Sequence, residues 1–296
     1  MNFPLVSIII PTYNRAFYLK LTLDSIIQQT FQDFEIIVVD DGTPNDDNFL
    51  LCKQYEKIRY IKIENSGGPA KPRNTGIKQA KGKYLAFTDD DDVWQVDKLE
   101  KQVEKLENNP EFGLVHCYCQ TIDGNGNLQD KIIGRPGDPN VKHGNVALRM
   151  MGNWTLMTSS VLIQKNVVDK VGLFNEKMPP AGEDAEYWIR CSFFTQFYYI
   201  DEPLVHYRIH TNNISKDNSS SFYLSIYMKR VLQEQLLGQR INKKEYKLLI
   251  SNLCRLQIRS LKIHTRIAIS NLFMLNPFWI LSWNHLKLLG FVLIKR

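Results

Sequence analysis

The clearest candidate for chemistry is a run of four aspartates, Asp89 to Asp92, between Phe87 and Trp94. The run follows an apolar segment that predicts a buried strand. In extended backbone, residues i and i+2 face the same side, so Asp89 and Asp91 can direct two carboxylates at one point. Hard oxygen ligands of this kind suit Mg²⁺ or Mn²⁺ that carries a diphosphate. The alternative is a solvated acidic turn or the cap of the helix that follows.

Three further polar clusters could share that site. Two of them directly follow apolar runs: the polar ends of SIIIPTYNR over 7–15 and of VVDDG over 38–42. Together they bring an aromatic ring and carboxylate acceptors to neighbouring strand ends, which suits a nucleobase with an imide N–H. The third, NSGGPAKPRNTG over 65–76, is glycine-rich and basic but lacks the spacing of a P-loop. Taken singly, each cluster is equally well a turn, a cap or a loop-to-helix junction.

Alternating strands and helices predict the scaffold that brings these clusters together. Apolar runs predict strands over 6–10, 35–39, 59–63 and 83–88, and helical spacing predicts helices over 19–27 and 70–80. This order favours an α/β fold with a doubly wound, mainly parallel sheet, in which ligands bind at the carboxyl ends of the strands. Further along, the pattern predicts a hairpin around 123–126, a mobile loop over 131–147, a strand over 157–164 and a helix over 183–194.

The ordered set of motifs SIIIPTYNR, VVDDG, GGPAKPRNTG, FTDDDDVW and GEDAEYWIR resembles the family 2 glycosyltransferases of the GT-A fold, over about residues 4–210. The resemblance implies a Rossmann-like nucleotide-binding half followed by an acceptor half. It also implies inverting transfer of a sugar from a nucleotide diphosphate, most often UDP, with Mn²⁺ or Mg²⁺ as cofactor.

The resemblance also implies roles for individual positions. The nucleotide-sugar-binding set is Pro11, Thr12, Tyr13, Arg15, Asp41, Arg73, Asn74, Asp89 and Asp90. Asp91 would be the direct metal ligand, with Asp89 and His210 beside it. Arg208 is a second candidate, with His210, to close over the diphosphate. Thr43 and Pro44 replace the serine usual after the DDG turn, which could alter a ribose contact.

Asp184 would be the catalytic base, because a single displacement needs one carboxylate to accept the acceptor's proton. Its place near the start of a predicted helix should keep it ionised. The competing interpretation is that Glu183 and Asp184 only cap that helix. Two residues are candidates for the acceptor site: Glu183, and Trp154, which could stack on a sugar or pack in the core.

The net charge of +6 is unevenly distributed: residues 1–221 hold 24 Lys and Arg against 29 Asp and Glu, whereas 222–296 hold 13 against 2. The basic region is helical in pattern and predicts an anionic partner. A membrane surface is favoured over nucleic acid, because no nucleic-acid-binding signature occurs in the body. Arg255, Arg259, Lys262 and Arg266 predict one basic helix face. The uncharged stretch 267–286, with Phe278, Trp279 and Trp283, predicts an interfacial helix.

The alternative for this region is a helical subdomain that packs on the body or on a second subunit of a homo-oligomer. We therefore expect a GT-A domain over 1–221 and a basic helical region over 222–296. The first ten residues have no basic segment before an apolar one, and the five cysteines form no CxxC pair. Both features predict a cytoplasmic protein, and the basic C-terminal region places it as a peripheral protein at the inner face of the membrane.

The expected function is transfer of a sugar from a UDP-sugar to a saccharide or lipid-linked acceptor, in the synthesis of a cell-surface polysaccharide or glycolipid. Two alternatives stay open. A sugar-phosphate nucleotidyltransferase shares the architecture, but its GxGxRL-type loop is absent. A non-catalytic nucleotide-sugar-binding scaffold protein would keep the base pocket and lose the metal-binding or base carboxylates.

Overall fold

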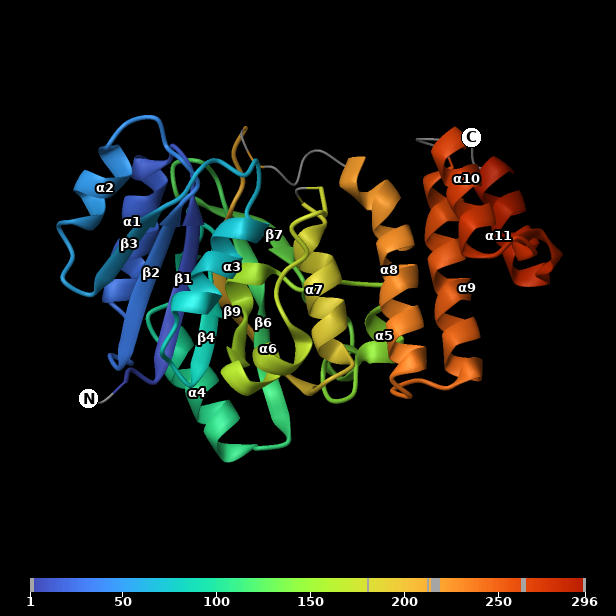
Figure 1. The fold of residues 1–296 in the computed structure, drawn as a ribbon, viewed down its shortest axis with the longest axis horizontal. Helices are drawn as coiled ribbons and strands as arrows, with labels where there is room; N and C mark the ends of the chain where they lie inside the picture. The colour runs from blue at the N-terminus through green and yellow to red at the C-terminus, as the bar shows by residue number, and fades with distance from the viewer. Residues whose placement is uncertain (1–2, 180, 212, 214–218, 262–264, 295–296) are drawn as a thin grey trace.

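Residues 6–87 form a parallel sheet whose strands are joined by helices (Figure 1). In the computed structural model the described residues are 3–179, 181–211, 213, 219–261 and 265–294. The parallel strands, in spatial order, are β3 (Ile58–Lys62), β2 (Phe34–Asp40), β1 (Val6–Thr12) and β4 (Tyr84–Phe87). Their connecting helices are α1 (Ala16–Ile27), α2 (Asp47–Cys52) and α3 (Ala70–Gln79). Every residue of β1 is buried, as the continuous apolar run predicts for a central strand.

Beyond β4 the same sheet becomes mixed. β8 (Leu162–Gln164) pairs antiparallel with β4 and with β6 (Phe112–Ile122), and β6 pairs parallel with β9 (Gln196–Arg208). Short β5 (Val93–Trp94) adds to β9, and β7 (Leu128–Ile133) forms the predicted hairpin with β6. The expected α/β fold with a C-terminal helical region is confirmed, with parallel pairing in the first half and mixed pairing after it.

The remaining helices of the body pack around the sheet. They are α4 (Lys98–Asn108), α5 (Ala147–Met150), α6 (Lys165–Val171), α7 (Glu183–Ser192) and the 3₁₀ helices η1 (Pro139–Lys142) and η2 (Thr158–Ser160). Two expectations are corrected here. The strand expected over 157–164 is η2 followed by the three-residue β8, because Ser160 hydrogen-bonds the Met157 carbonyl and favours a turn. The loop expected from 131 begins only after β7 ends at Ile133, and it contains η1.

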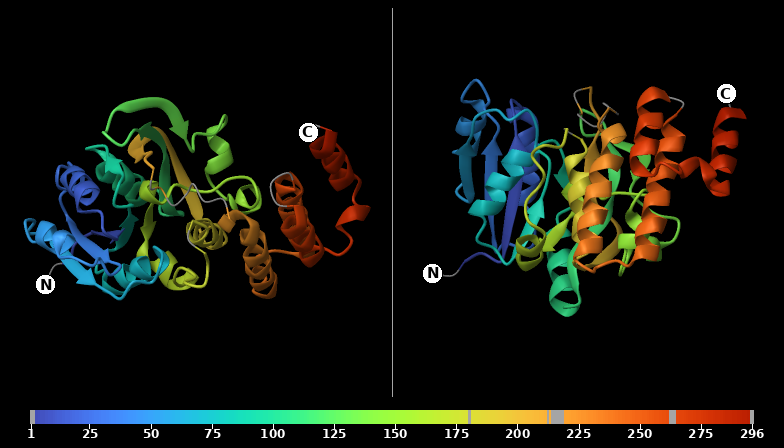
Figure 2. Two further views of the ribbon diagram at one scale, coloured as in Figure 1. Left: turned by 90° about the horizontal axis from the view of Figure 1, so that it is seen from above. Right: turned by 45° about the vertical axis from the view of Figure 1, so that its right-hand side comes forward.

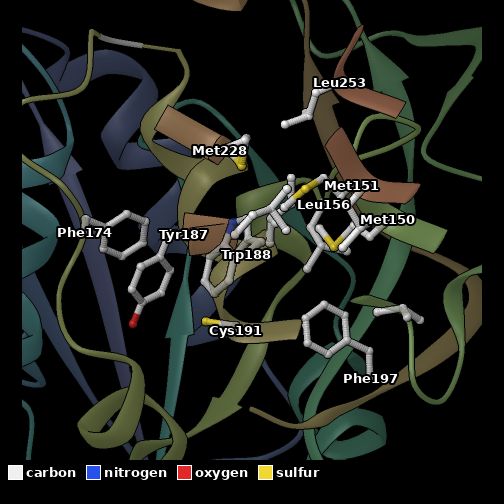
Figure 3. Packing of buried hydrophobic residues seen from close by; sticks show 14 of the residues in the cluster. Met150, Met151, Leu156, Phe174, Tyr187, Trp188, Cys191, Phe197, Met228 and Leu253 are labelled. Atoms are coloured by element: carbon white, nitrogen blue, oxygen red, sulfur yellow. The ribbon is translucent and has the colours of Figure 1, made fainter. Parts of the chain in front are cut away.

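Two clusters of buried apolar side chains hold the layers together. One packs α1 and α4 against the sheet through residues such as Leu19, Leu23 and Val103. The other lies around Trp188 of α7 and continues into the C-terminal helices through Met228 and Leu253 (Figure 3). The C-terminal helices therefore share a continuous core with the body, which agrees with packing on the body as one of the alternatives considered above.

The C-terminal region consists of α8 (Ser219–Leu237), α9 (Lys243–Ser260), α10 (Thr265–Leu275), η4 (Trp279–Leu281) and α11 (Trp283–Ile294). α8 contacts α7, α9 lies beside α8, and α10 and α11 lie farthest from the sheet (Figures 1 and 2). Within the described ranges, no helix is long and apolar enough to cross a membrane.

Two expectations about this region are wrong. The basic residues do not share one helix, because Arg255 and Arg259 lie on α9 and Arg266 on α10; Lys262 lies outside the described residues. The uncharged stretch is not one helix either, since α10 ends at Leu275 and Pro277 follows, which lacks the N–H that a helix interior needs. Trp279 is 5% exposed and belongs to the core.

Candidate active site

A cavity of about 750 Å³ opens where β1, β2 and β4 end. The polar segments that follow these strands meet here, because the carboxyl ends of parallel strands lie at one edge of the sheet. The predicted site residues that line the cavity are Pro11, Thr12, Tyr13, Arg15, Asp41, Arg73, Asp89, Asp90, Asp91, Glu183 and Asp184. The structure therefore brings together residues that lie more than 170 positions apart in the sequence.

One end of the cavity is formed by Tyr13 and Asp41. Tyr13 is exposed at the rim, and the Oδ1 atom of Asp41 accepts hydrogen bonds from the backbone N–H (3.0 Å) and hydroxyl (2.8 Å) of Ser66. Asp41 thus fixes the start of the glycine-rich loop and also lines the cavity. Its neighbour Asp40 is buried and accepts from Asn48 and from the Thr43 N–H, so it stabilises the turn.

Thr43 points into the protein. It is buried, and its hydroxyl oxygen accepts from the Asn14 N–H at 2.8 Å. The threonine that departs from the family pattern therefore supports the β1 terminus, and it does not line the cavity.

The aspartate run is a turn and not the extended segment that we expected, with the Asp92 N–H directed at the Asp89 carbonyl. The run folds back because buried Asp92 accepts hydrogen bonds from the Ser159 hydroxyl and the Arg208 N–H. Asp89, Asp90 and Asp91 still reach the cavity together. Arg15 joins two of them, with its Nη1 atom 3.1 Å from Asp90 and 2.9 Å from Asp91.

Three neighbouring carboxyl groups, those of Asp89, Asp90 and Asp91, repel one another when ionised in this part of the site. Burial, and then repulsion from Asp91, raises the pKa of Asp90 to about 7, although Arg15 opposes the shift. Burial, and then repulsion from Asp89, raises the pKa of Asp91 to about 6. Carboxyl groups that hold protons so tightly favour a cation that would let them ionise.

Among the described residues, no group of three His, Cys, Asp or Glu side chains is arranged to hold a metal ion by itself. Mg²⁺ commonly needs only one or two carboxylates when substrate phosphates complete its shell. Asp89 and Asp91 could supply these carboxylates. His210 Nε2 lies 2.9 Å from Asp91 Oδ2, the oxygen that also pairs with Arg15. His210 does not itself line the cavity.

Arg73 connects the aspartate run with the start of α7. Its Nη2 atom donates to Asp89 and its Nη1 atom to Glu183, both at 2.7 Å. Arg73 and Glu183 are each 3% exposed, so this ion pair is buried. Glu183, one of the acceptor candidates, is thus committed to Arg73, although it also lines the cavity.

Asp184 lies in the cavity wall at the second position of α7. Its Oδ1 atom accepts from the Ala185 N–H at 2.6 Å. Desolvation, and then repulsion from Glu183, raises its pKa to about 7 against the opposing effect of Arg73. This raised pKa runs against the expectation that the helix N-terminus keeps the group ionised, because desolvation and the charge of Glu183 favour the protonated form. A pKa near the working pH is nevertheless what a general base requires.

Besides His210, three candidates lie outside the cavity lining. Asn74 is buried and hydrogen-bonds the connection between α6 and α7. Trp154 packs beside His116, with ring centroids 6.2 Å apart, so it has the core role and does not face the cavity. Arg208 is buried and donates to the Asp91 carbonyl at 2.8 Å, so of the two basic candidates only His210 reaches the Asp91 carboxylate.

The sequence analysis missed several lining residues. Ser159, Leu156 and Met157 form one wall, and Leu224 of α8 contributes from the C-terminal region. A strand was predicted over 157–164, so the side chains of Met157 and Ser159 were not considered, and no pattern singled out Leu156. The polar triplet Thr158-Ser159-Ser160 was the available signal, because such residues favour turns over strand interiors.

Comparison with known proteins identifies the class. The family described as "Glycosyl transferase family 2" matches residues 7–161, just over half of the chain. An uncharacterized glycosyltransferase of Rickettsia bellii is 34% identical over 219 residues, which cover 73% of this chain and 30% of that protein. The chain spans 30 to 39% of the length of three Rickettsia relatives. This chain belongs to glycosyl transferase family 2.

Solved structures confirm the GT-A fold. S. aureus TarS 1–349 in complex with UDP-GlcNAc superposes with a TM-score of 0.68 at 20% identity, covering 97% of this chain and 79% of that one. The mannosyltransferase PcManGT of Pyrobaculum calidifontis, in complex with GDP-Man and Mn²⁺, gives a TM-score of 0.60 at 15% identity, covering 99% and 85%.

Proposed function

We propose that this chain is an inverting glycosyltransferase that moves a sugar from a UDP-sugar to a hydroxyl group of a saccharide or lipid-linked acceptor. The observation that carries the proposal is one cavity that joins Asp41, the aspartate run and Asp184. These three groups correspond to the three requirements of the reaction: recognition of the nucleotide, neutralisation of the diphosphate and acceptance of a proton.

The donor nucleotide binds at the Tyr13 end of the cavity. The carboxylate of Asp41 accepts the imide N–H of a uracil, and the exposed ring of Tyr13 stacks on the base. TarS, which shares the fold, binds UDP-GlcNAc, and this supports a UDP-linked donor.

Asp91 and Asp89 hold a divalent cation, with His210 beside Asp91. Bound Mn²⁺ or Mg²⁺ supplies positive charge that neutralises the departing diphosphate. The raised pKa values of Asp90 and Asp91 support this role, since the carboxyl groups at the cavity outnumber the arginines there. Mn²⁺ in the PcManGT complex supports it further.

Asp184 accepts the proton of the acceptor hydroxyl as that oxygen attacks the anomeric carbon, opposite the leaving diphosphate. One displacement inverts the configuration and needs one carboxylate, whereas glycoside hydrolysis needs two carboxylates that flank the bond. A non-catalytic sugar-nucleotide scaffold has no need for Asp184 in the same cavity as the aspartate run, so the catalytic function is favoured.

The test is a thermal-shift panel of nucleotide sugars with Mn²⁺, followed by turnover of each hit. Asp91→Ala should abolish Mn²⁺-dependent UDP binding in calorimetry, because the diphosphate charge is then poorly neutralised. Asp169→Ala is the control, since Asp169 is exposed on α6, pairs with Lys165 and does not line the cavity. Unchanged UDP affinity in Asp91→Ala would contradict the metal assignment.

As a second part of the proposal, the chain binds the cytoplasmic face of an anionic membrane through its C-terminal helices. The support is an exposed apolar surface on η4 and its flanks, where Phe278, Leu281 and Trp283 are 70%, 76% and 77% exposed. Residues 246–296 contain eight Lys and Arg and no Asp or Glu. Aromatic side chains with basic neighbours match the headgroup region of such a membrane.

Co-sedimentation with vesicles tests this part. Phe278→Ser/Leu281→Ser/Trp283→Ser should lose binding to phosphatidylglycerol vesicles, whereas Leu50→Ser/Leu128→Ser should keep it, because those exposed leucines lie on the catalytic body. Binding that ignores both lipid charge and the triple substitution would contradict membrane docking. A concentration-dependent dimer that the triple variant abolishes would assign the surface to a second copy.

A further inference from the structure

Two consecutive residues of α3 hold both ends of the segment that leads into α7. This segment, residues 172–182, connects α6 to α7, and Glu183 and Asp184 follow it directly. Arg73 binds Glu183 at its far end, and Asn74 binds Phe174 and Glu176 near its beginning. Helix α3 also packs on β1 and β2, which carry the nucleotide end of the cavity.

The side-chain amide of Asn74 makes three hydrogen bonds to this segment. Its Oδ1 atom accepts the Phe174 N–H at 2.8 Å, and its Nδ2 atom donates to the Phe174 carbonyl at 2.9 Å and to Glu176 Oε1 at 2.7 Å. Asn74 is buried and does not line the cavity. It therefore has the contacts of a backbone clamp and lacks those of a nucleotide ligand.

The segment also contains one non-glycine residue in the left-handed region of backbone conformation. Ala181 has a φ of 64°, a conformation that residues other than glycine rarely adopt and that neighbouring contacts must enforce. At the clamped end, the ring of Phe174 stacks on Tyr187 of α7, with centroids 3.8 Å apart (Figure 3). Holding Phe174 thus fixes both the segment and the first turns of α7.

We propose that Asn74 is a positioning residue that clamps Phe174 and Glu176 so that Asp184 faces the cavity at the correct distance from the donor. The proposal rests on the function proposed above, because it concerns the placement of the base. It differs from the role that the family resemblance implies, in which Asn74 supports the nucleotide. Substitution of Asn74 should lower UDP affinity if the residue supports the nucleotide, and should leave it unchanged if the residue positions the base.

Asn74→Ala provides the test, with three measurements on the full chain. Hydrogen exchange should accelerate in peptides covering 172–185, because the Phe174 N–H loses its acceptor. UDP affinity with Mn²⁺ should stay within about twofold of wild type. Turnover per UDP-binding site, counted by calorimetric stoichiometry to correct for unfolded protein, should fall by about 10²-fold, the loss expected from a misplacement near 1 Å.

Two matched variants separate positioning from a general loss of stability. Glu176→Gln keeps an oxygen to accept from Asn74 and should retain turnover, whereas Glu176→Ala should lose part of it. Asn271→Ala removes another buried asparagine, on α10, and should lower the melting temperature without changing turnover per site.

Three results would overturn the proposal: unchanged exchange in 172–185, UDP affinity lowered in Asn74→Ala, or normal turnover per site. If the wild-type protein binds UDP but turns over none of the donors, the proposed sugar transfer is wrong. The hydrogen-exchange measurement then decides by itself whether Asn74 holds the segment 172–182 in place.

Discussion

The rate of sugar transfer should fall as the pH drops below about 7, because Asp184 must be ionised to accept a proton. Burial and the neighbouring Glu183 raise the pKa of Asp184 to about 7. A base is active above its pKa, so about nine-tenths of the protein is competent at pH 8 and about one-tenth at pH 6. Turnover at saturating donor and Mn²⁺ should therefore be about tenfold lower at pH 6 than at pH 8.

Glu183→Gln tests whether Asp184 causes the acidic limb of the pH profile, which is the fall in rate below about pH 7. Glutamine keeps the size of the side chain and an oxygen for Arg73, but it removes the negative charge that repels the Asp184 carboxylate. The pKa of Asp184 should fall, and the midpoint of the acidic limb should move to lower pH. Glu186→Gln is the control, because Glu186 pairs with Arg190 and is not among the main causes of the Asp184 pKa shift.

The assay is the initial rate of UDP release from pH 5.5 to 9, with UDP affinity measured at each pH. That second measurement separates loss of the base from loss of donor binding. A flat rate between pH 6 and 8, or a midpoint that rises in Glu183→Gln, would refute the assignment of the limb to Asp184.

Two further predictions concern stability. The pKa values of Asp90 and Asp91, raised to about 7 and 6, mean that the folded chain holds protons that the unfolded chain releases, so these groups stabilise it less as pH rises from about 4 to 7. Mn²⁺ should bind the ionised carboxylates and raise the melting temperature more at pH 7.5 than at pH 5.5; an equal rise at both would contradict this. Gly76→Ala should destabilise the chain by about 1–3 kcal/mol, because the added Cβ would lie 2.5 Å from Ile9 Cγ2. Gly137→Ala meets no neighbour and is the control, and equal melting temperatures in the two variants would contradict the packing argument.

The positions of β1, β2 and β4 were predictable because each is an apolar run that ends at a polar cluster. Parallel pairing then brings those clusters to one edge, so the cavity followed from local pattern and one topological rule. The hairpin of β6 and β7 was predictable for a similar reason, since its turn residues are contiguous in the sequence.

What the sequence did not reveal depends on distant partners. The aspartate run folds into a turn because Ser159 and Arg208 bind Asp92 from other strands and turns. Asn74 is drawn away from the cavity by Phe174, a hundred positions along the chain. The raised pKa of Asp184 arises from burial that only the assembled fold produces. None of these contacts leaves a periodic signal in the sequence.

The most direct measurement of the proposed mechanism is the transfer rate of Asp184→Asn at saturating donor, with its melting temperature and UDP affinity. Asparagine keeps the size of the side chain and an oxygen that can accept from the Ala185 N–H, so folding and donor binding should be preserved. Because it accepts no proton from the acceptor, transfer should fall by roughly 10²–10⁴-fold. A folded Asp184→Asn protein that transfers sugar within about tenfold of the wild-type rate would contradict the assignment of Asp184 as the base.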